Sequence, residues 1–255
     1  MVASERWCDM NRNEFFQALP VTKLVLRLTS AALEICTDDI DDIHVMISGA
    51  KADVEALRIA ASANMLTVEQ PVAKLARPAP ASGSWLQIAI RLPRTWKGAI
   101  EARTVSGWMN IRSVAGSDLS LDTVSGMIMA TDLSFITLSA RTITGDVKLN
   151  QVTTDKISLF STSGSLAALR TALRIGSAST VTGLITLDLV SPFEELTMNS
   201  VTGDLGVDAP ITECDASLRS VSGRLRSGGI AITEGAAKVR ATTVSSDLDI
   251  TCNIE

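Results

Sequence analysis

The sequence has few of the residue types that usually carry catalysis or metal binding. Among its 255 residues there is one histidine, His44, and the four cysteines (Cys8, Cys36, Cys214 and Cys252) are far apart and form no Cys-x-x-Cys pair. Zinc sites and nucleophilic triads need several such side chains at defined spacings. We therefore expect no metal site and no catalytic triad, and we expect the cysteines to be free thiols in a reducing compartment.

Aromatic residues, phosphate-binding loops and clusters of positive charge are also scarce. The chain has five Phe, four Trp and no Tyr, and it contains no Gly-x-Gly-x-x-Gly or P-loop sequence. Nucleotide cofactors therefore have no recognisable binding motif. The formal net charge is -5, and Lys and Arg are scattered along the chain rather than gathered in a stripe. We expect neither a cofactor nor nucleic-acid binding.

Long apolar runs are missing as well. The first fourteen residues contain acidic and basic side chains throughout, which leaves no apolar core for a secretory leader. The most apolar early stretch, residues 21–36, is interrupted by Lys23, Arg27 and Glu34 and cannot span a bilayer. For a chain whose natural start is Met1, these features predict a cytoplasmic protein without membrane insertion.

What the sequence does contain is a repeated four-residue motif. A hydroxyl residue is followed by Val, Ile or Thr, then by a second hydroxyl residue, and then by glycine, and the motif returns at intervals of 19 or 20 residues, with one final interval of 23. A fixed period of this size indicates a solenoid. The glycine position is occupied by Gly107, Gly126, Gly145, Gly164, Gly183, Gly203, Gly223 and, in the eighth copy, Ser246.

Apolar residues alternate on both sides of this glycine position. They stand seven and five residues before it and two and four residues after it, and each set has the period of a strand with one buried face. The two sets have opposite parity, so the inward face must change within the motif. A corner containing glycine permits this change, because glycine accepts positive φ and close backbone approach. The motif is therefore predicted to be a corner between two strands.

Three further expectations follow from the aligned copies. The apolar residues inside the motif (Val124, Ile143, Val181, Val201 and Val221) and those two positions after the glycine are expected in the core. An apolar column seven positions after the glycine (Val114, Leu133, Val152, Thr171, Val190, Pro210 and Ile230) predicts a short third side. Ser246 is expected in the outermost coil, with its outer edge partly exposed, because a terminal coil is not stacked on its far side. The corner hydroxyls are expected to hydrogen-bond along the stack.

The fold prediction is an all-β chain that forms a single parallel β-solenoid with coils of 19–20 residues. Residues 100–255 carry the regular repeats, and residues 1–99 are predicted to form an irregular, β-rich N-terminal cap. Strands are expected near 24–28, 33–36, 44–48 and 85–92, and a loop at 77–83. Residues 1–20 are expected to contain a short helix, and 51–64 fit either a helix or a turn followed by a strand at 56–60.

The chain also resembles a known family. A strand ending in Leu-Pro, a spacer, the run Ala-Arg-Thr-Val-Ser-Gly, and then serial Thr-Val-Ser-Gly and Thr-Ile-Thr-Gly-Asp units are similar to a bacterial β-strand-repeat family of unknown function whose members are called putative adhesins. The resemblance covers residues 20–255. Asp146, Asp204 and Asp247 keep the family's Asp after the glycine position, whereas other copies depart from it. The resemblance implies the fold and an adhesin-like role, and it implies no catalytic residue.

Few individual side chains are candidates for chemistry. His44 lies in a strand pattern without catalytic neighbours in the sequence, and the acidic group Asp38, Asp39, Asp41 and Asp42 lacks the spacing of a calcium loop. We interpret the group as a solvated turn. The outward acids Asp118, Asp122, Asp132 and Asp146 fall at different phases of the repeat. Trp85, Trp96 and Trp108 either close the open end of the core or offer a surface to a partner or a sugar.

These observations predict a non-enzymatic interaction or assembly module, adhesin-like, that acts through a protein partner or as a homo-oligomer. The alternative is a polysaccharide-processing enzyme on a β-helix scaffold, which would need clustered acids on one side of the rod. No catalytic, cofactor-binding or metal-binding residue is assigned from the sequence.

Overall fold

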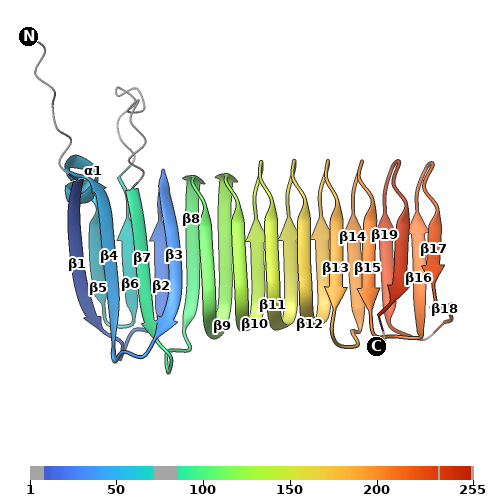
Figure 1. Cartoon of the computed structure of the whole chain (residues 1–255), viewed down its shortest axis with the longest axis horizontal. Helices are drawn as coiled ribbons and strands as arrows, with labels where there is room; N and C mark the ends of the chain where they lie inside the picture. Colours follow the sequence, from blue (N-terminus) through green and yellow to red (C-terminus); the bar gives the residue numbers. More distant parts are fainter. Residues whose placement is uncertain (1–8, 72–85, 235, 254–255) are drawn as a thin grey trace, which may run out of the picture.

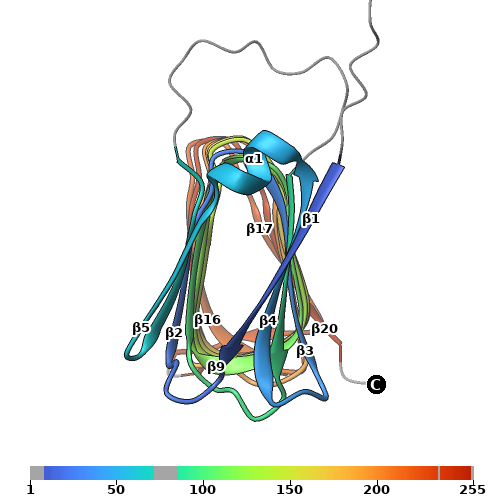
Figure 2. The ribbon, with the colours of Figure 1, turned by 90° about the vertical axis from the view of Figure 1, so that its left-hand side faces the viewer.

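The chain forms an elongated, two-faced stack of strands, which the computed structural model describes for residues 9–71, 86–234 and 236–253. Strands of the two faces run side by side along the whole length of the molecule (Figure 1), and the end view shows a narrow interior between them (Figure 2). Nearly all regular structure is strand, with one short helix, α1 (Lys51–Ala56). The predicted all-β class is confirmed.

Each face is a continuous sheet. In spatial order from the N-terminal end of the stack, the first face contains β1 (Asp9–Gln17), β4 (Asp42–Ala50), β7 (Leu86–Pro93), β3 (Ala31–Asp38), the first parts of β9 (Met109–Ser125), β10 (Ile128–Arg141), β11 (Val147–Phe160) and β12 (Leu166–Ser179), and then β13 (Ile185–Leu189), β15 (Leu205–Ala209), β20 (Leu248–Cys252) and β17 (Leu225–Gly228). In the same direction, the second face contains β5 (Arg58–Ser62), β6 (Met65–Glu69), β2 (Lys23–Arg27), β8 (Ala99–Ser106), the later parts of β9 to β12, β14 (Glu195–Asn199), β19 (Lys238–Thr242) and β16 (Glu213–Arg219), with β18 (Ala231–Ile232) paired to the start of β16.

Pairing is parallel except at the N-terminal end. Equivalent residues of successive repeats lie side by side, as where Ile128 pairs with Met109 on one side and with Val147 on the other. The antiparallel pairs are β1–β4, β4–β7 and β5–β6. A mostly parallel sheet is what strands repeated at a constant interval produce. The division of the chain at residue 99 remains a prediction. Strand β2, from the N-terminal part, pairs directly with β8, which begins at Ala99.

The order of the layers departs from the order of the sequence at both ends of the stack. The layer made by β2 and β3 lies between the β6–β7 layer and the β8–β9 layer. In the same way, the last layer of the chain, β19 and β20, lies between the β14–β15 layer and the β16–β17 layer. The expectation for Ser246 is therefore wrong: only 2% of this residue is exposed, because the β16–β17 layer covers the far side of its layer.

One of the two predicted core columns is buried and the other is exposed. Residues two positions after the glycine position are 0–1% exposed from Met109 to Leu248, except Leu225 in the spatially last layer, which is 37% exposed. The apolar column inside the motif lies at the surface, with Val181 40% and Val124 43% exposed, so its predicted burial is wrong. Inward and outward side chains of the preceding strand continue to alternate up to the first hydroxyl residue of the motif, which is buried, as in Thr123 and Ser161. The next residue, which is the apolar one, therefore points outward.

The corner glycines are required by backbone contact between layers. Gly145 has φ +144°, and a Cβ atom built there would lie 2.2 Å from the carbonyl oxygen of Gly126 in the neighbouring layer. The hydroxyls of the motif also join the layers, since Thr144 Oγ1 donates to the Val124 carbonyl oxygen at 3.3 Å. The predicted hydrogen bonding along the stack is thus present at this column, as at Ser125, Thr182, Thr202 and Ser222.

A second bend, inside the long strands β9 to β12, depends on residues other than glycine. Ser113, Asp132, Gln151 and Arg170 recur every 19 residues, and each has a positive φ between 49° and 57°. One left-handed residue in each strand turns the chain from the first face toward the second. Beyond this bend the predicted third column is buried at Val114, Leu133, Val152, Thr171 and Ile230, whereas Val190 is 55% exposed.

The N-terminal end differs from the sequence expectation in one element. The helix expected within residues 1–20 is wrong, because Asp9–Gln17 form strand β1, which crosses the N-terminal end of the stack (Figure 2). The apolar residues Phe15, Phe16 and Leu19 fit a strand followed by a turn as well as they fit one side of a helix. Residues 51–64 contain both alternatives in succession, namely α1 and then β5. The loop expected at 77–83 lies outside the described residues.

Candidate functional site

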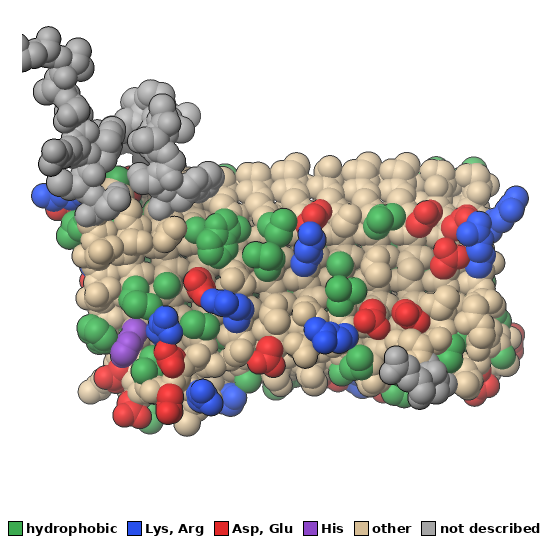
Figure 3. Space-filling view, in the orientation of Figure 1, with side chains coloured by type: hydrophobic (Ala, Val, Ile, Leu, Met, Phe, Trp, Pro, Cys, Tyr) green, Lys and Arg blue, Asp and Glu red, His purple; other side chains and the backbone are tan. Residues whose placement is uncertain are grey.

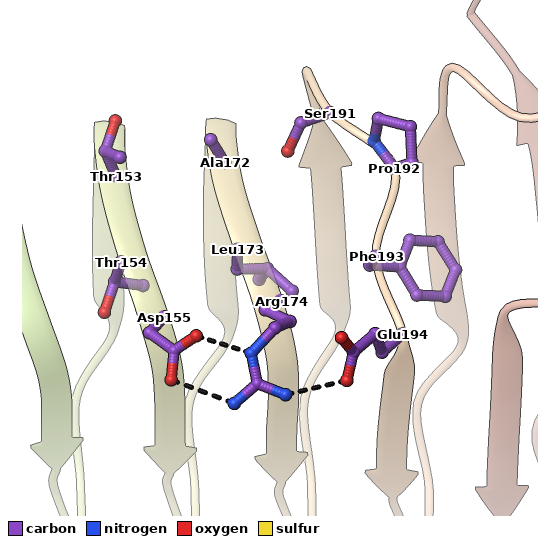
Figure 4. A pocket seen from close by; sticks show the side chains of 10 residues that line it. All are labelled: Thr153, Thr154, Asp155, Ala172, Leu173, Arg174, Ser191, Pro192, Phe193 and Glu194. Atoms are coloured by element: carbon purple, nitrogen blue, oxygen red, sulfur yellow. Dashed lines mark hydrogen bonds and ion pairs between the residues drawn. The ribbon is translucent and has the colours of Figure 1, made fainter.

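A cleft lies where strands β11 and β12 meet the segment that joins β13 to β14. It has a volume of about 420 Å³ and is lined by Thr153, Thr154, Asp155, Ala172, Leu173, Arg174, Ser191, Pro192, Phe193 and Glu194. Figure 4 shows Arg174 of β12 between Asp155 of β11 and Glu194, which directly precedes β14. We call this depression the Arg174 cleft.

A guanidinium group between two carboxylates occupies the cleft. Arg174 Nε and Nη2 donate to the two carboxylate oxygens of Asp155 at 2.5 and 3.0 Å, and Nη1 donates to Glu194 Oε2 at 2.7 Å. These bonds lower the pKa of Asp155 and raise that of Arg174. A general acid must hold a proton near neutral pH, and a carboxyl whose pKa is lowered does not. The arrangement joins neighbouring layers by charge and favours the ionised form of Asp155.

The cleft originates from a change in the repeat interval. The glycine-to-glycine interval lengthens from 19 residues before Gly183 to 20 after it. The pairing of β12 with β13 shifts register at Thr171, which lies opposite Leu189. Val190 is consequently exposed while Phe193 is buried, and the chain leaves the regular path of the earlier copies. Sequence reasoning did not identify Arg174, Asp155 or Glu194, and the extra residue in this copy is the signal that marks their position.

The residues singled out in the sequence are not brought together. His44 is half-buried on β4, where Phe15 of β1 contacts its ring edge-on with the ring centres 4.5 Å apart. Asp38 lies before the β3–β4 turn, and its pKa is lowered because it accepts hydrogen bonds from the Asp39 amide and from Arg91. No group of three or more His, Cys, Asp or Glu side chains within the described residues is arranged to hold a metal ion.

The outward acids also have separate local partners. Asp118 accepts a hydrogen bond from Thr137, and Asp122 lies 3.5 Å from Arg103. Asp146 accepts from the backbone amide of Ser165, the equivalent position in the next layer. Asp204 and Asp247 repeat this bond, with the amides of Asp247 and Arg224 as donors. The Asp that follows the glycine position therefore connects one layer to the next. Asp132 has a different role, since it is one of the left-handed residues at the second bend.

The tryptophans divide between the core and the surface. Trp96 is 5% exposed, and its indole Nε1 donates to the Val21 carbonyl oxygen at 2.8 Å, so it belongs to the buried core. Trp108 is 40% exposed and lies directly before β9. Trp85 lies outside the described residues. Cys36 and Cys252 are half-buried and Cys214 is buried, and all three are free thiols.

A line of exposed apolar side chains runs along the corner motif. Figure 3 shows one face of the molecule, on which exposed apolar side chains are scattered among polar and charged ones. We define the aliphatic edge as the exposed apolar residues inside the motif, each of which is at least 40% exposed. In spatial order the edge contains one side chain per layer and is interrupted by Thr162. Its members are Val105, Val124, Ile143, Val181, Val201, Val244 and Val221.

The fold is that of the Toastrack DUF4097 family. The family model matches residues 21–253, and the chain belongs to this family. Its function is not defined by this membership. The family assignment confirms the resemblance that the repeat motifs indicated.

Solved structures with the same fold come from species of Bacteroides and Parabacteroides. One, described as a putative adhesin from Bacteroides fragilis, has 15% sequence identity and a TM-score of 0.63, covering 95% of this chain and 97% of that one. A second, a putative adhesin from Parabacteroides distasonis, has 15% identity and a TM-score of 0.58, covering 94% and 97%. A third, from Parabacteroides merdae, has 12% identity and a TM-score of 0.50, covering 94% and 95%. Identities this low show a shared fold alone.

No curated protein matches the chain. Within the part of the chain that the structure describes, no helix is both long enough and apolar enough to cross a membrane.

Proposed function

We propose that this protein is a β-solenoid interaction or assembly module that turns over no substrate and binds a protein partner or further copies of itself. The observation that carries the proposal is the aliphatic edge. It places exposed β-branched aliphatic side chains in a line, one in each repeat layer except that of Thr162. Exposed apolar side chains that gather on one surface mark interaction sites in soluble proteins. The adhesin descriptions of the structural neighbours agree with such a role.

The chemistry of the molecule supports the absence of turnover. In the Arg174 cleft two acids converge, and both are bound to the same guanidinium. A polysaccharide hydrolase needs one protonated and one ionised carboxyl group on either side of the scissile bond. Here both carboxyl groups are held by Arg174, and the lowered pKa of Asp155 disfavours it as the protonated member of such a pair.

Sedimentation velocity across a wide concentration range tests the assembly role. The combined variant Val124→Ser, Ile143→Ser and Val201→Ser removes the centre of the aliphatic edge. We expect it to reduce association of the protein with itself or with a bound partner and to leave the fold intact, because these side chains lie at the surface. Ile136→Ser is the matched control, since Ile136 is 61% exposed but is not part of the edge.

A direct assay tests the absence of turnover. The protein is incubated with a panel of polysaccharides, and newly formed reducing ends are measured. We expect none. Release of reducing ends by the wild-type protein that is lost in Asp155→Asn would replace the proposal with the polysaccharide-processing alternative.

A further inference from the structure

The N-terminal end of the stack carries a long strand with one edge that no strand of the described residues pairs. β1 contains nine residues and pairs along its full length with β4. The short helix α1 also packs against it. The other strands at the ends of the stack are shorter, with five residues in β5, seven in β16, four in β17 and two in β18. An unpaired edge presents free amide and carbonyl groups to any strand that can pair with it.

We propose that β1 pairs with β1 of a second copy, antiparallel and about a twofold axis at Asn13, so that two molecules join by their N-terminal ends. The inference rests on the proposed assembly role and names the partner and the surface. In this register, residues whose numbers add to 26 lie opposite each other. Met10 then faces Phe16 of the second copy, and Arg12 faces Glu14 of the second copy.

The alternation of β1 selects this kind of register. Its even-numbered residues 10–16 are half-buried, and its odd-numbered residues 11–17 are exposed. Met10 and Phe16 pack against the core. A twofold axis that passes through a residue places even residues opposite even residues, and the two sheets then continue with their inner faces on the same side. An axis between two residues would place half-buried residues opposite exposed ones.

The charges of β1 select one register among those that remain. An axis at Asn13 places Arg12 opposite Glu14 twice, once on each side of the axis. An axis at Arg12 would place the two arginines opposite each other, and an axis at Glu14 would do the same for the two glutamates. Opposite charges in directly facing positions stabilise a strand pair, and like charges destabilise it. The order of charges along β1 is therefore complementary to itself when the strand is reversed.

The structure of the single chain already holds these side chains in place. Arg12 forms an ion pair with Glu14 of its own strand, and its Nη1 donates to the Leu57 carbonyl oxygen at 2.9 Å. In the paired arrangement the four charges of the two copies alternate in sign around the axis. On the outer side of the sheet, Phe15, which is 64% exposed, comes to lie beside Asn11 of the second copy. A twofold contact of this kind closes after two copies and does not propagate into a fibre.

Charge exchange tests the proposal in the full-length protein. By sedimentation velocity, the wild-type protein is expected to form a dimer of twice its 27.0 kDa mass. Arg12→Glu alone and Glu14→Arg alone are each expected to weaken dimerisation by at least about tenfold, because each places like charges opposite each other twice. An equimolar mixture of the two variants is expected to form heterodimers, because opposite charges then meet at both pairs. A role of Arg12 and Glu14 within a single chain would not produce this recovery.

Cross-linking provides a second readout that does not alter the charges. Asn13→Cys places a thiol beside its own copy at the axis, where facing Cβ atoms are about 4.5–5.5 Å apart. We expect it to form a disulfide-linked dimer under mild oxidation, faster than the wild-type protein does. Ser48→Cys is the control, because Ser48 lies one strand away from the free edge, opposite Asn11.

Three outcomes would overturn the inference. The first is a wild-type protein that stays monomeric at all concentrations, in which case Arg12 and Glu14 protect the edge from pairing. The second is cross-linking of Asn13→Cys no faster than of Ser48→Cys. The third is association that is lost in the aliphatic-edge variant and unaffected by both charge variants. This last result would leave the proposed assembly role standing and reject β1 as its surface.

Discussion

A single methyl group added at a corner glycine should disrupt the stack. In Gly145→Ala, the new Cβ would lie 2.2 Å from the Gly126 carbonyl oxygen and 2.8 Å from its carbonyl carbon. Both atoms belong to the backbone of the neighbouring layer, so no side-chain rotation can relieve the contact. The layers must separate locally, which breaks the hydrogen bonds that join them on both sides of the corner.

The magnitude follows from two contributions. Residue 145 has φ +144°, a conformation that L-residues other than glycine rarely adopt, and a left-handed backbone costs roughly 1–2 kcal/mol. Forcing extra volume into a packed site costs about 1–3 kcal/mol. We therefore expect the free energy of unfolding to fall by roughly 2–5 kcal/mol, which is a large part of the about 5–15 kcal/mol that stabilises a typical protein.

Urea denaturation followed by circular dichroism measures this loss. Gly206→Ala is the matched control: Gly206 has no strained φ, and its nearest contact for a new Cβ is the Ile185 carbonyl oxygen at 3.8 Å. This control should unfold at the wild-type urea concentration or slightly above it, because alanine restricts the unfolded chain. If Gly145→Ala and Gly206→Ala had the same midpoint, the contact between corner glycines would not determine the stability of the stack.

Three further predictions concern the corner and the cleft. Val181→Asp should change the free energy of unfolding by no more than about 1 kcal/mol, because Val181 is 40% exposed. Leu187→Asp should lower it by more than about 4 kcal/mol, because Leu187 is only 2% exposed. Equal losses in urea denaturation would contradict the orientation of the corner. Thr142→Val should stabilise the protein by about 1 kcal/mol, because the buried Thr142 hydroxyl has no hydrogen-bond partner. Thr180→Val should destabilise it by about as much, because the Thr180 hydroxyl donates to two carbonyl groups. Thermal denaturation of both variants tests these opposite signs. In an NMR titration Asp155 should ionise below its usual pKa of 3.8. The stabilisation from its ion pair is then complete above pH 3.8 and is lost as the pH falls through the lowered pKa. A midpoint at or above 3.8 would mean that the ion pair is absent in solution.

Much of the architecture could be predicted from the sequence, because each repeat has the same motif and the same spacing of apolar residues. The period and the alternation on either side of the glycine identified the parallel strands and the buried column from Met109 to Leu248. The glycines themselves were identified as corners, and their close contacts with neighbouring layers are the reason. The absence of catalytic spacing around His44 was also visible, although the Arg174 cleft was not. That cleft depends on one inserted residue, whose effect on register appears only when the strands are paired.

The orientation of the corner required the structure because two signals conflicted there. Residue type favoured burial of Val124 and its equivalents, whereas alternation favoured burial of the hydroxyl before them. Alternation prevails because the strand keeps its geometry up to the corner, and a buried hydroxyl can still bond to a carbonyl group, as Thr104 does to that of Ser106. The aliphatic edge is the result, and the prediction of a buried Val column missed it.

The amino-acid sequence alone determined the class, the period, the direction of strand pairing and the positions of the corners, since each of these follows from spacing along the chain. Only the tertiary structure decided the order in which the layers stack. The copies ending at Gly223 and at Ser246 present nearly the same pattern, so either could pair with the layer of Gly203, and the chain places the later copy there. When two repeats present the same pairing residues, the sequence pattern does not determine which of them stacks on a given layer. The choice depends on the connecting segments and on how each end of the core is closed.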